Sequence, residues 1–115
     1  MIKNFECINI SSKNPKKLAD FYKSVGIPVF SGDDIYDGCH IGNEKESYIC
    51  VWDENRWGKA AGGFCTFVFK VDDLQKTYDE IIAKGITVPP IKPTDWGGQE
   101  MTFKDPDGNK IILLT

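Results

Sequence analysis

Aromatic and acidic side chains are interleaved in three loop-like segments of this chain, around Tyr36, Trp57 and Trp96. The carboxylates concerned are Asp33, Asp34 and Asp37 near Tyr36, Asp53 and Glu54 before Trp57, and Asp95 and Glu100 around Trp96. Rings beside carboxylates suit a cationic or flat polar ligand, which they hold through charge and cation–π contact. Acidic loops also occur simply because they are solvated, so both interpretations stay open at this point.

The other groups that could do chemistry are the single histidine, His40, and four cysteines: Cys7, Cys39, Cys50 and Cys65. The cysteines show no CxxC spacing, and a chain of 115 residues does not need disulfide staples, so free thiols and no zinc site are predicted. A nucleophilic cysteine needs a base or a positive field beside it. No basic residue adjoins Cys7 or Cys50. This favours a binding protein over an enzyme that uses Cys7, His40 and Glu100 in thiol or acid–base chemistry.

The overall composition excludes several classes of partner. The net charge is -3, and no cluster of Lys and Arg is present to bind nucleic acid phosphates. No apolar run approaches the ~18 residues that a membrane span needs, and the N-terminus does not resemble a signal peptide. The sequence therefore predicts a cytoplasmic protein that binds neither nucleic acid nor a membrane.

An internal repeat organises the chain. Residues 5–29 are echoed by residues 64–88 at a constant offset of 59, the difference between Phe64 and Phe5. The same offset aligns Lys17 with Lys76, Asp20 with Asp79, Gly26 with Gly85 and Val29 with Val88. Two copies, rather than three or more, indicate a pseudo-symmetric domain and not a solenoid.

Each copy shows the same order of elements. The first half is expected to contain a strand over 5–10, a helix capped by Asn14 with Pro15 at its first position and ending at Gly26, and strands over 27–30, 38–41 and 48–52. The second half is expected to contain a strand over 64–71, a helix capped by Asp72 or Asp73 and ending at Gly85, and strands over 86–88, 100–103 and 110–114. The last two strands of each half align at an offset of 62, as Cys50 does with Ile112. The prediction is an α+β fold of two βαβββ modules, 1–52 and 64–115, joined by a linker over 53–63 in one domain.

These modules carry motifs that are similar to those of a known family. Phe21, Tyr22, Gly26 and Ile27 end the first unit, Trp96 to Gly98 form an aromatic-glycine loop, and residues 103–113 read FKDPDGNKIIL. Over nearly its whole length the chain resembles the vicinal oxygen chelate superfamily, which includes glyoxalase I, extradiol dioxygenases and bleomycin resistance proteins. The resemblance implies curved sheets around a shared cavity.

Enzymes of this superfamily hold a divalent metal with His, Gln and Glu side chains on the first and last strand of each module. The resemblance places those four positions at Cys7, Cys50, Thr66 and Ile112. None is a His, Glu or Asp, and a shift of one residue would turn the side chain to the other face of the sheet. We therefore expect no family-type metal and no cofactor. A site made of the two thiols Cys7 and Cys50 is the remaining alternative.

The hollow implied by the resemblance would still bind a small organic molecule. The residues predicted to contact this ligand are Cys7, Asn9, Tyr36, Cys50, Trp52, Trp57, Thr66, Trp96, Met101 and Ile112. Metal-free members of the superfamily sequester bleomycin-type antibiotics in an acidic groove of a dimer. Capture of a cationic or aromatic molecule by a homodimer is thus the expected function. The alternative is an enzyme of the same family, a lyase, isomerase or dioxygenase type, with a noncanonical metal site or metal-free acid–base chemistry.

Overall fold

The computed structural model describes residues 1–30 and 38–115, in two compact units that comprise residues 1–62 and 63–115. Tyr36 lies outside the described residues. Each unit contains one four-stranded mixed sheet and one ten-residue helix. The predicted α+β class and the βαβββ order are confirmed in both halves.

The first unit is built from β1 (Cys7–Ser12), α1 (Pro15–Ser24), β2 (Val29–Phe30), β3 (Cys39–Gly42), β4 (Tyr48–Asp53) and the short helix α2 (Glu54–Trp57). Its sheet has the order β1-β4-β3-β2, in which β1 and β4 are parallel and the other neighbours antiparallel. The segment predicted to be only a linker therefore begins with a helical turn. Asp53 caps that turn by accepting a hydrogen bond from the Asn55 amide at 2.8 Å.

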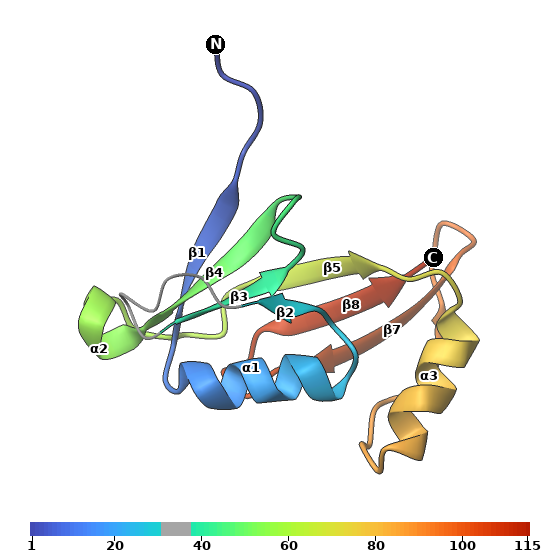
Figure 1. Cartoon of the computed structure of the whole chain (residues 1–115). Helices are drawn as coiled ribbons and strands as arrows, with labels where there is room; N and C mark the ends of the chain where they lie inside the picture. The colour runs from blue at the N-terminus through green and yellow to red at the C-terminus, as the bar shows by residue number, and fades with distance from the viewer. Residues whose placement is uncertain (31–37) are drawn as a thin grey trace. The chain divides into compact units, whose positions relative to one another are not determined.

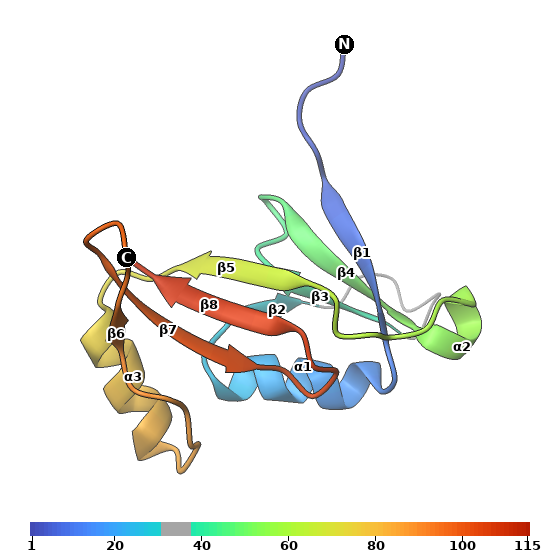
Figure 2. The ribbon, with the colours of Figure 1, turned by 180° about the vertical axis from the view of Figure 1, so that it is seen from behind.

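The second unit repeats this plan with β5 (Thr66–Lys70), α3 (Leu74–Ala83), β6 (Lys92–Pro93), β7 (Gln99–Lys104) and β8 (Lys110–Leu114). Its sheet order is β5-β8-β7-β6, with β5 and β8 parallel. Figure 2 shows β6 and β7 beside α3. The strand predicted over 86–88 does not form. The second strand of this unit is instead the two-residue β6, because Pro89, Pro90 and Pro93 lack the amide hydrogens that a longer ladder requires.

Local sequence accounts for both long helices. The Asn14 side chain accepts a hydrogen bond from the Lys17 amide at 3.1 Å, and Asp73 accepts one from the Lys76 amide at 3.0 Å. Each helix is followed by a glycine with positive φ, +89° at Gly26 and +81° at Gly85, a conformation that side chains with a Cβ avoid. The equivalent helices of the two copies thus begin and end by the same chemistry.

One face of each sheet is covered by its helix. In the first unit Ile10, Ile41, Ile49 and Val51 are buried on the face that α1 covers. In the second unit the buried side chains on the α3 side are those of Phe67, Met101, Phe103, Ile111 and Leu113. Because side chains alternate along a strand, the residues between these face the other way. We call the surface of each sheet opposite to its ten-residue helix the helix-free face; in the first unit the short helix α2 adjoins this face through Trp57.

Candidate functional site

The helix-free face of the first unit gathers aromatic, thiol and amide groups. Strand register places Asn9 opposite Cys50 and Cys50 opposite His40, while Cys7 lies opposite Tyr48 and His40 opposite Phe30. Trp52 follows Cys50 by two residues on the same strand. Four of the predicted contact residues, Cys7, Asn9, Cys50 and Trp52, therefore share one face of one sheet.

Hydrogen bonds hold one end of this face in place. The amide oxygen of Asn9, Oδ1, accepts a hydrogen bond from Trp52 Nε1 at 3.1 Å and one from Cys7 Sγ at 3.9 Å. The Trp52 ring stacks on Trp57 of α2, with centroids 5.6 Å apart and an interplanar angle of 23°. The Lys59 ammonium lies 4.9 Å from the Trp57 ring centroid. The linker prediction missed this contribution of α2, which brings the second indole onto the face.

A second aromatic group lies on the same face. Phe30 and His40 stack with centroids 4.8 Å apart, and both rings meet Tyr48 nearly edge-on at 5.1 and 5.0 Å. His40 Nδ1 is buried and has no hydrogen-bond partner among the described residues. A buried polar atom without a partner costs free energy unless a ligand or water satisfies it. His40 therefore presents an open hydrogen-bonding position inside this aromatic group.

Burial favours the neutral form of two thiols of this unit, Cys50 and Cys39, by raising the pKa of each. Burial raises the pKa of Cys50, the neighbouring Cys7 raises it further, and a hydrogen bond from Trp52 opposes the rise. Cys39 lies on the face covered by α1, where its Sγ donates to the Pro15 carbonyl oxygen at 3.7 Å. Burial and then the charge of Cys50 raise the pKa of Cys39 to about 11, against a smaller opposing effect of Lys23. Neutral thiols are poor nucleophiles and poor metal ligands at neutral pH.

The helix-free face of the second unit has the same register but different side chains. Val68 lies opposite Ile112, and Ile112 lies opposite Thr102. Thr66 is exposed on the same face as Val68, and Ile112 is half-buried. Met101, predicted to contact the ligand, is fully buried on the α3 side and not on the helix-free face. Because Thr102 faces Ile112, its neighbour Met101 has to point the other way.

The predicted set of contact residues leaves out two equivalent positions on the helix-free faces, His40 and Thr102. The offset of 62 that aligns Cys50 with Ile112 also aligns His40 with Thr102. Thr102 Oγ1, like His40 Nδ1, is buried without a hydrogen-bond partner among the described residues. The repeat could have identified both positions, because strand alternation puts His40 on the same face as Cys50 and the offset of 62 then points to Thr102. Each unit thus has one unsatisfied polar atom at the same place in its sheet.

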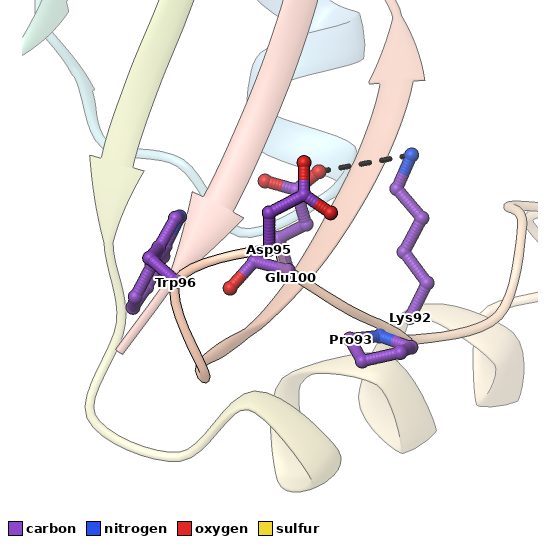
Figure 3. A pocket seen from close by; sticks show the side chains of 6 residues that line it. Lys92, Pro93, Asp95, Trp96 and Glu100 are labelled. Atoms are coloured by element: carbon purple, nitrogen blue, oxygen red, sulfur yellow. Dashed lines mark ion pairs between the residues drawn. The ribbon is translucent and has the colours of Figure 1, made fainter.

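A hollow of about 280 Å³ lies at the hairpin of β6 and β7 in the second unit (Figure 3). Its lining residues are Lys92, Pro93, Thr94, Asp95, Trp96 and Glu100. Lys92 Nζ lies 3.7 Å from Glu100 Oε1. Trp96 is 66% exposed although it is a large aromatic residue. The hollow contains one residue of the predicted ligand-contact set, Trp96, together with both carboxylates that bracket it in sequence.

The donor set for a family-type metal does not fit. Cys7 and Cys50 lie on the helix-free face of the first unit, and Thr66 and Ile112 on that of the second. An alkyl side chain cannot ligate a cation, and the hard divalent metals prefer oxygen and imidazole donors to thiols. Within residues 1–30 and 38–115, no three His, Cys, Asp or Glu side chains are grouped to hold a metal ion. The four positions instead carry small or apolar groups on the two faces.

Comparison with known proteins identifies the family. The chain belongs to the Glyoxalase/Bleomycin resistance protein/Dioxygenase superfamily, whose family model matches residues 5–113. Among curated proteins it is similar to YraH of Bacillus subtilis strain 168, described as uncharacterized, with 29% identity over 112 residues that cover 85% of this chain and 87% of YraH.

Solved structures share the fold. The antibiotic-binding protein TnmS3 from Streptomyces sp. CB03234 is 22% identical, with a TM-score of 0.72 over 98% of this chain and 95% of that one. A bleomycin-binding protein complexed with bleomycin is 18% identical, with a TM-score of 0.71 over 99% of this chain and 98% of that one. In the part of the chain that the structure describes, no helix is both long and apolar enough to span a membrane.

Proposed function

We propose that this protein captures a small, flat organic molecule on the helix-free face of its first unit and does not use a family-type metal. The observation that carries the proposal is the pair of aromatic groups, Trp52 with Trp57 and Phe30 with His40 and Tyr48, on either side of Cys50. Tyr48 and Trp52 are four residues apart on β4, which corresponds to roughly 13 Å along a strand. This spacing suits a planar ring system lying over Cys50 and Asn9.

Polar groups on the face would orient that ligand. His40 Nδ1 offers an unsatisfied hydrogen-bonding position, and the Asn9 amide is already held by Trp52 and Cys7. Pockets for small molecules commonly combine apolar walls with a few fixed polar groups. Two structural neighbours are named for bleomycin binding and antibiotic binding, which supports a ligand of antibiotic type. Thr66 and Ile112, on the helix-free face of the second unit, are proposed as further ligand contacts.

The protein is further proposed to be a cytoplasmic homodimer. β1 and β5 are edge strands of their sheets, and large apolar side chains are exposed on or next to them: Phe5, Ile8, Phe64 and Val68. Unpaired strand edges and exposed apolar groups favour association with another surface. Light scattering coupled to size-exclusion chromatography would measure the mass, and a monomer at micromolar concentration would contradict the dimer.

Native mass spectrometry with metal analysis on freshly purified protein tests the capture proposal first. We expect no stoichiometric transition metal, whereas one metal ion per chain would overturn the metal-free mechanism. Thermal shift with metal-free bleomycin and a panel of flat aromatic and cationic compounds then searches for a ligand, since ligands that bind the folded state raise the melting temperature. A stabilising compound that is recovered chemically unchanged supports capture. A compound that is converted supports the enzyme alternative.

A matched pair of variants locates the site. Trp52→Ala removes an indole from the first unit, and Leu114→Ala changes the residue that the offset of 62 aligns with it in the second. For the compound found by thermal shift, we expect Trp52→Ala to weaken affinity about tenfold or more, because stacked aromatic contacts contribute on this scale. Leu114→Ala should leave the affinity within about twofold. If the two substitutions weaken the affinity equally, the first unit is not the principal binding site.

A further inference from the structure

The Asn9 amide on the helix-free face of the first unit offers a ligand hydrogen-bond donors and no free acceptor. Its oxygen, Oδ1, accepts hydrogen bonds from Trp52 Nε1 at 3.1 Å and from Cys7 Sγ at 3.9 Å. An indole N–H can only donate, so the atom that faces Trp52 has to be the amide oxygen. The amide nitrogen, Nδ2, points elsewhere and has no acceptor among the described residues. Because Asn9 is exposed, its two N–H groups are accessible to a ligand.

The segment after α2 places a positive charge at the other indole of this face. Gly58 has a φ of +76°, and its amide donates to the Glu54 carbonyl oxygen at 2.9 Å, which ends the helical turn. The chain then folds back, because the Ala61 amide donates to Glu54 Oε2 at 2.9 Å. Lys59 lies between these two anchors, with its ammonium 4.9 Å from the Trp57 ring centroid. Backbone contacts on both sides thus hold Lys59 beside the indole pair.

The Lys59 ammonium is available for a stronger partner. It forms no ion pair with a carboxylate of residues 1–30 and 38–115. Its contact with Trp57 is exposed, and exposed cation–π contacts are weaker than charge-assisted hydrogen bonds to a carboxylate. The lysine chain is flexible, so the ammonium can leave the ring without a change in the backbone. An anionic group bound on this face can therefore recruit Lys59.

The thiol and carboxylate groups nearest the indole pair oppose an anion only weakly. Burial raises the pKa of Cys50, so its thiol is neutral and carries a weak S–H donor. The Asp53 carboxylate accepts a hydrogen bond from the Asn55 amide at 2.8 Å, and this bond stabilises its charge. The Glu54 carboxylate is engaged in the same way by the Ala61 amide. The face therefore combines unused donors with a positive charge.

We propose that the molecule captured on the first unit is an aromatic acid. Its carboxylate accepts hydrogen bonds from Asn9 Nδ2 and pairs with Lys59, while its ring system rests against the indole pair of Trp52 and Trp57. This inference rests on the proposed function and specifies the charge of its ligand. A carboxylate has about four lone-pair positions, so it can satisfy the amide and the ammonium together. A cationic ligand would leave the Asn9 donors unsatisfied and would be repelled by Lys59.

Three naphthalene derivatives of nearly the same shape separate charge from aromatic contact. At about pH 7, 2-naphthoate is anionic, 2-naphthamide is neutral and 2-naphthamidine is cationic. Binding would be followed by the NMR signals of the Trp52 indole N–H and the Asn9 side-chain amide. We expect naphthoate to bind about tenfold more tightly than naphthamide, because it gains charge-assisted contacts, and naphthamidine to bind least tightly. Equal affinities, or tightest binding of the cation, would overturn the proposal.

Asn9→Asp tests the amide donors with almost no change in shape. The substitution keeps the oxygen that accepts from Trp52 and replaces only the amide nitrogen by a second oxygen. We expect the naphthoate affinity to fall about tenfold or more, and naphthamidine to become the tighter of the two charged probes. If the naphthoate affinity does not fall, Asn9 does not contact the carboxylate and the proposal fails.

Lys59→Met tests the ammonium, because methionine keeps an unbranched apolar chain and removes the charge. We expect this variant to weaken naphthoate binding about threefold to tenfold and to change naphthamide binding less than twofold. Lys17→Met, at an exposed lysine of α1, alters the net charge equally and is the matched control. It should change naphthoate binding less than twofold, since water and salt screen distant exposed charges. Equal losses for the two lysine variants would contradict a contact with Lys59.

Trp52→Ala separates failure of this inference from failure of capture. If the three probes bind the unaltered protein equally and Trp52→Ala weakens all of them, capture on the first unit stands and the proposed charge of the ligand is wrong. If no probe binds, or if Trp52→Ala leaves the binding unchanged, both proposals fail. Circular dichroism confirms that each variant is folded.

Discussion

The two helix-free faces have the same backbone register but carry different kinds of side chain. The row Asn9, Cys50 and His40 in the first unit corresponds to the row Val68, Ile112 and Thr102 in the second. In the first row Cys50 is flanked by two aromatic groups, one of which includes His40 itself, whereas the second row is mainly aliphatic. The comparison shows that the duplicated backbone constrains where side chains point but leaves their chemistry free to diverge.

The turns before the last strand of each sheet also differ. In the second unit Asp105 and Asn109 are buried and bonded to each other, and the Asn109 side chain accepts a hydrogen bond from the Cys65 amide at 3.3 Å. In the first unit the corresponding turn uses Asn43, which is exposed and accepts a hydrogen bond from the Lys45 amide at 3.0 Å. The turn before the last strand is therefore held by a buried polar network in the second unit, whereas the corresponding turn in the first unit is solvated.

The largest expected effect comes from breaking that network. Asp105 Oδ1 accepts hydrogen bonds from the Asp107 and Asn109 amides at 2.9 Å, and Oδ2 accepts one from Asn109 Nδ2 at 2.9 Å. Asp105→Ala leaves these donors without their acceptor and should lower the free energy of unfolding by about 2–4 kcal/mol, measured by urea denaturation. Asn43→Ala in the other turn should cost less than about 1 kcal/mol. Equal losses would contradict the difference drawn between the turns.

An intermediate effect is expected from alkaline pH at Cys39, whose equivalent by the offset of 62 is the non-titrating Met101. Because folding raises the pKa of Cys39 from 9.0 to about 11, the protonated thiol stabilises the folded state. This contribution is complete below pH 9 and is lost as the pH rises toward 11. The loss should be about 1 kcal/mol after allowance for the partial exposure of the thiol.

Cys39→Ala isolates that contribution from the other groups that titrate at high pH. We expect the stability difference between the unaltered protein and this variant to shrink between pH 9 and 11, as measured by urea denaturation at each pH. A difference that stays constant across this range would show that the Cys39 thiol is not held in its neutral form by folding.

The smallest effect concerns the two unsatisfied polar atoms. Thr102→Val replaces the Oγ1 hydroxyl with a methyl group and should raise the free energy of unfolding by about 0.5 kcal/mol, because a buried hydroxyl without a partner is removed. His40→Phe should likewise not destabilise the free protein by more than about 1 kcal/mol, but it should weaken capture of the compound found by thermal shift. A loss of more than about 1 kcal/mol for Thr102→Val would show that a bound water satisfies this hydroxyl.

The sequence predicted those features that depend on local chemistry. The cap at Asn14 and the glycines that follow both helices were identified, and the second cap was narrowed to Asp72 or Asp73, of which the structure uses Asp73, because capping and positive φ are properties of a few neighbouring residues. Strand alternation predicted that Asn9, Cys50 and Ile112 share a face parity, and all three lie on the helix-free faces of their sheets. Alternation alone did not assign the Met101 side chain to the α3 side of the sheet. The register of β7 against β8 depends on the five-residue turn from 105 to 109 and not on β7 alone.

The amino-acid sequence by itself determined the duplication, the helix boundaries and the absence of the family's hard metal ligands, because each depends on residue type and short-range spacing. Only the tertiary structure decided that α2 brings Trp57 onto Trp52, that Phe30, His40 and Tyr48 form one aromatic group, and that Lys92 faces Glu100. These contacts join residues on different strands and turns. Which residues meet depends on the pairing of the strands and on the path of the turns. A local sequence pattern does not encode either of these.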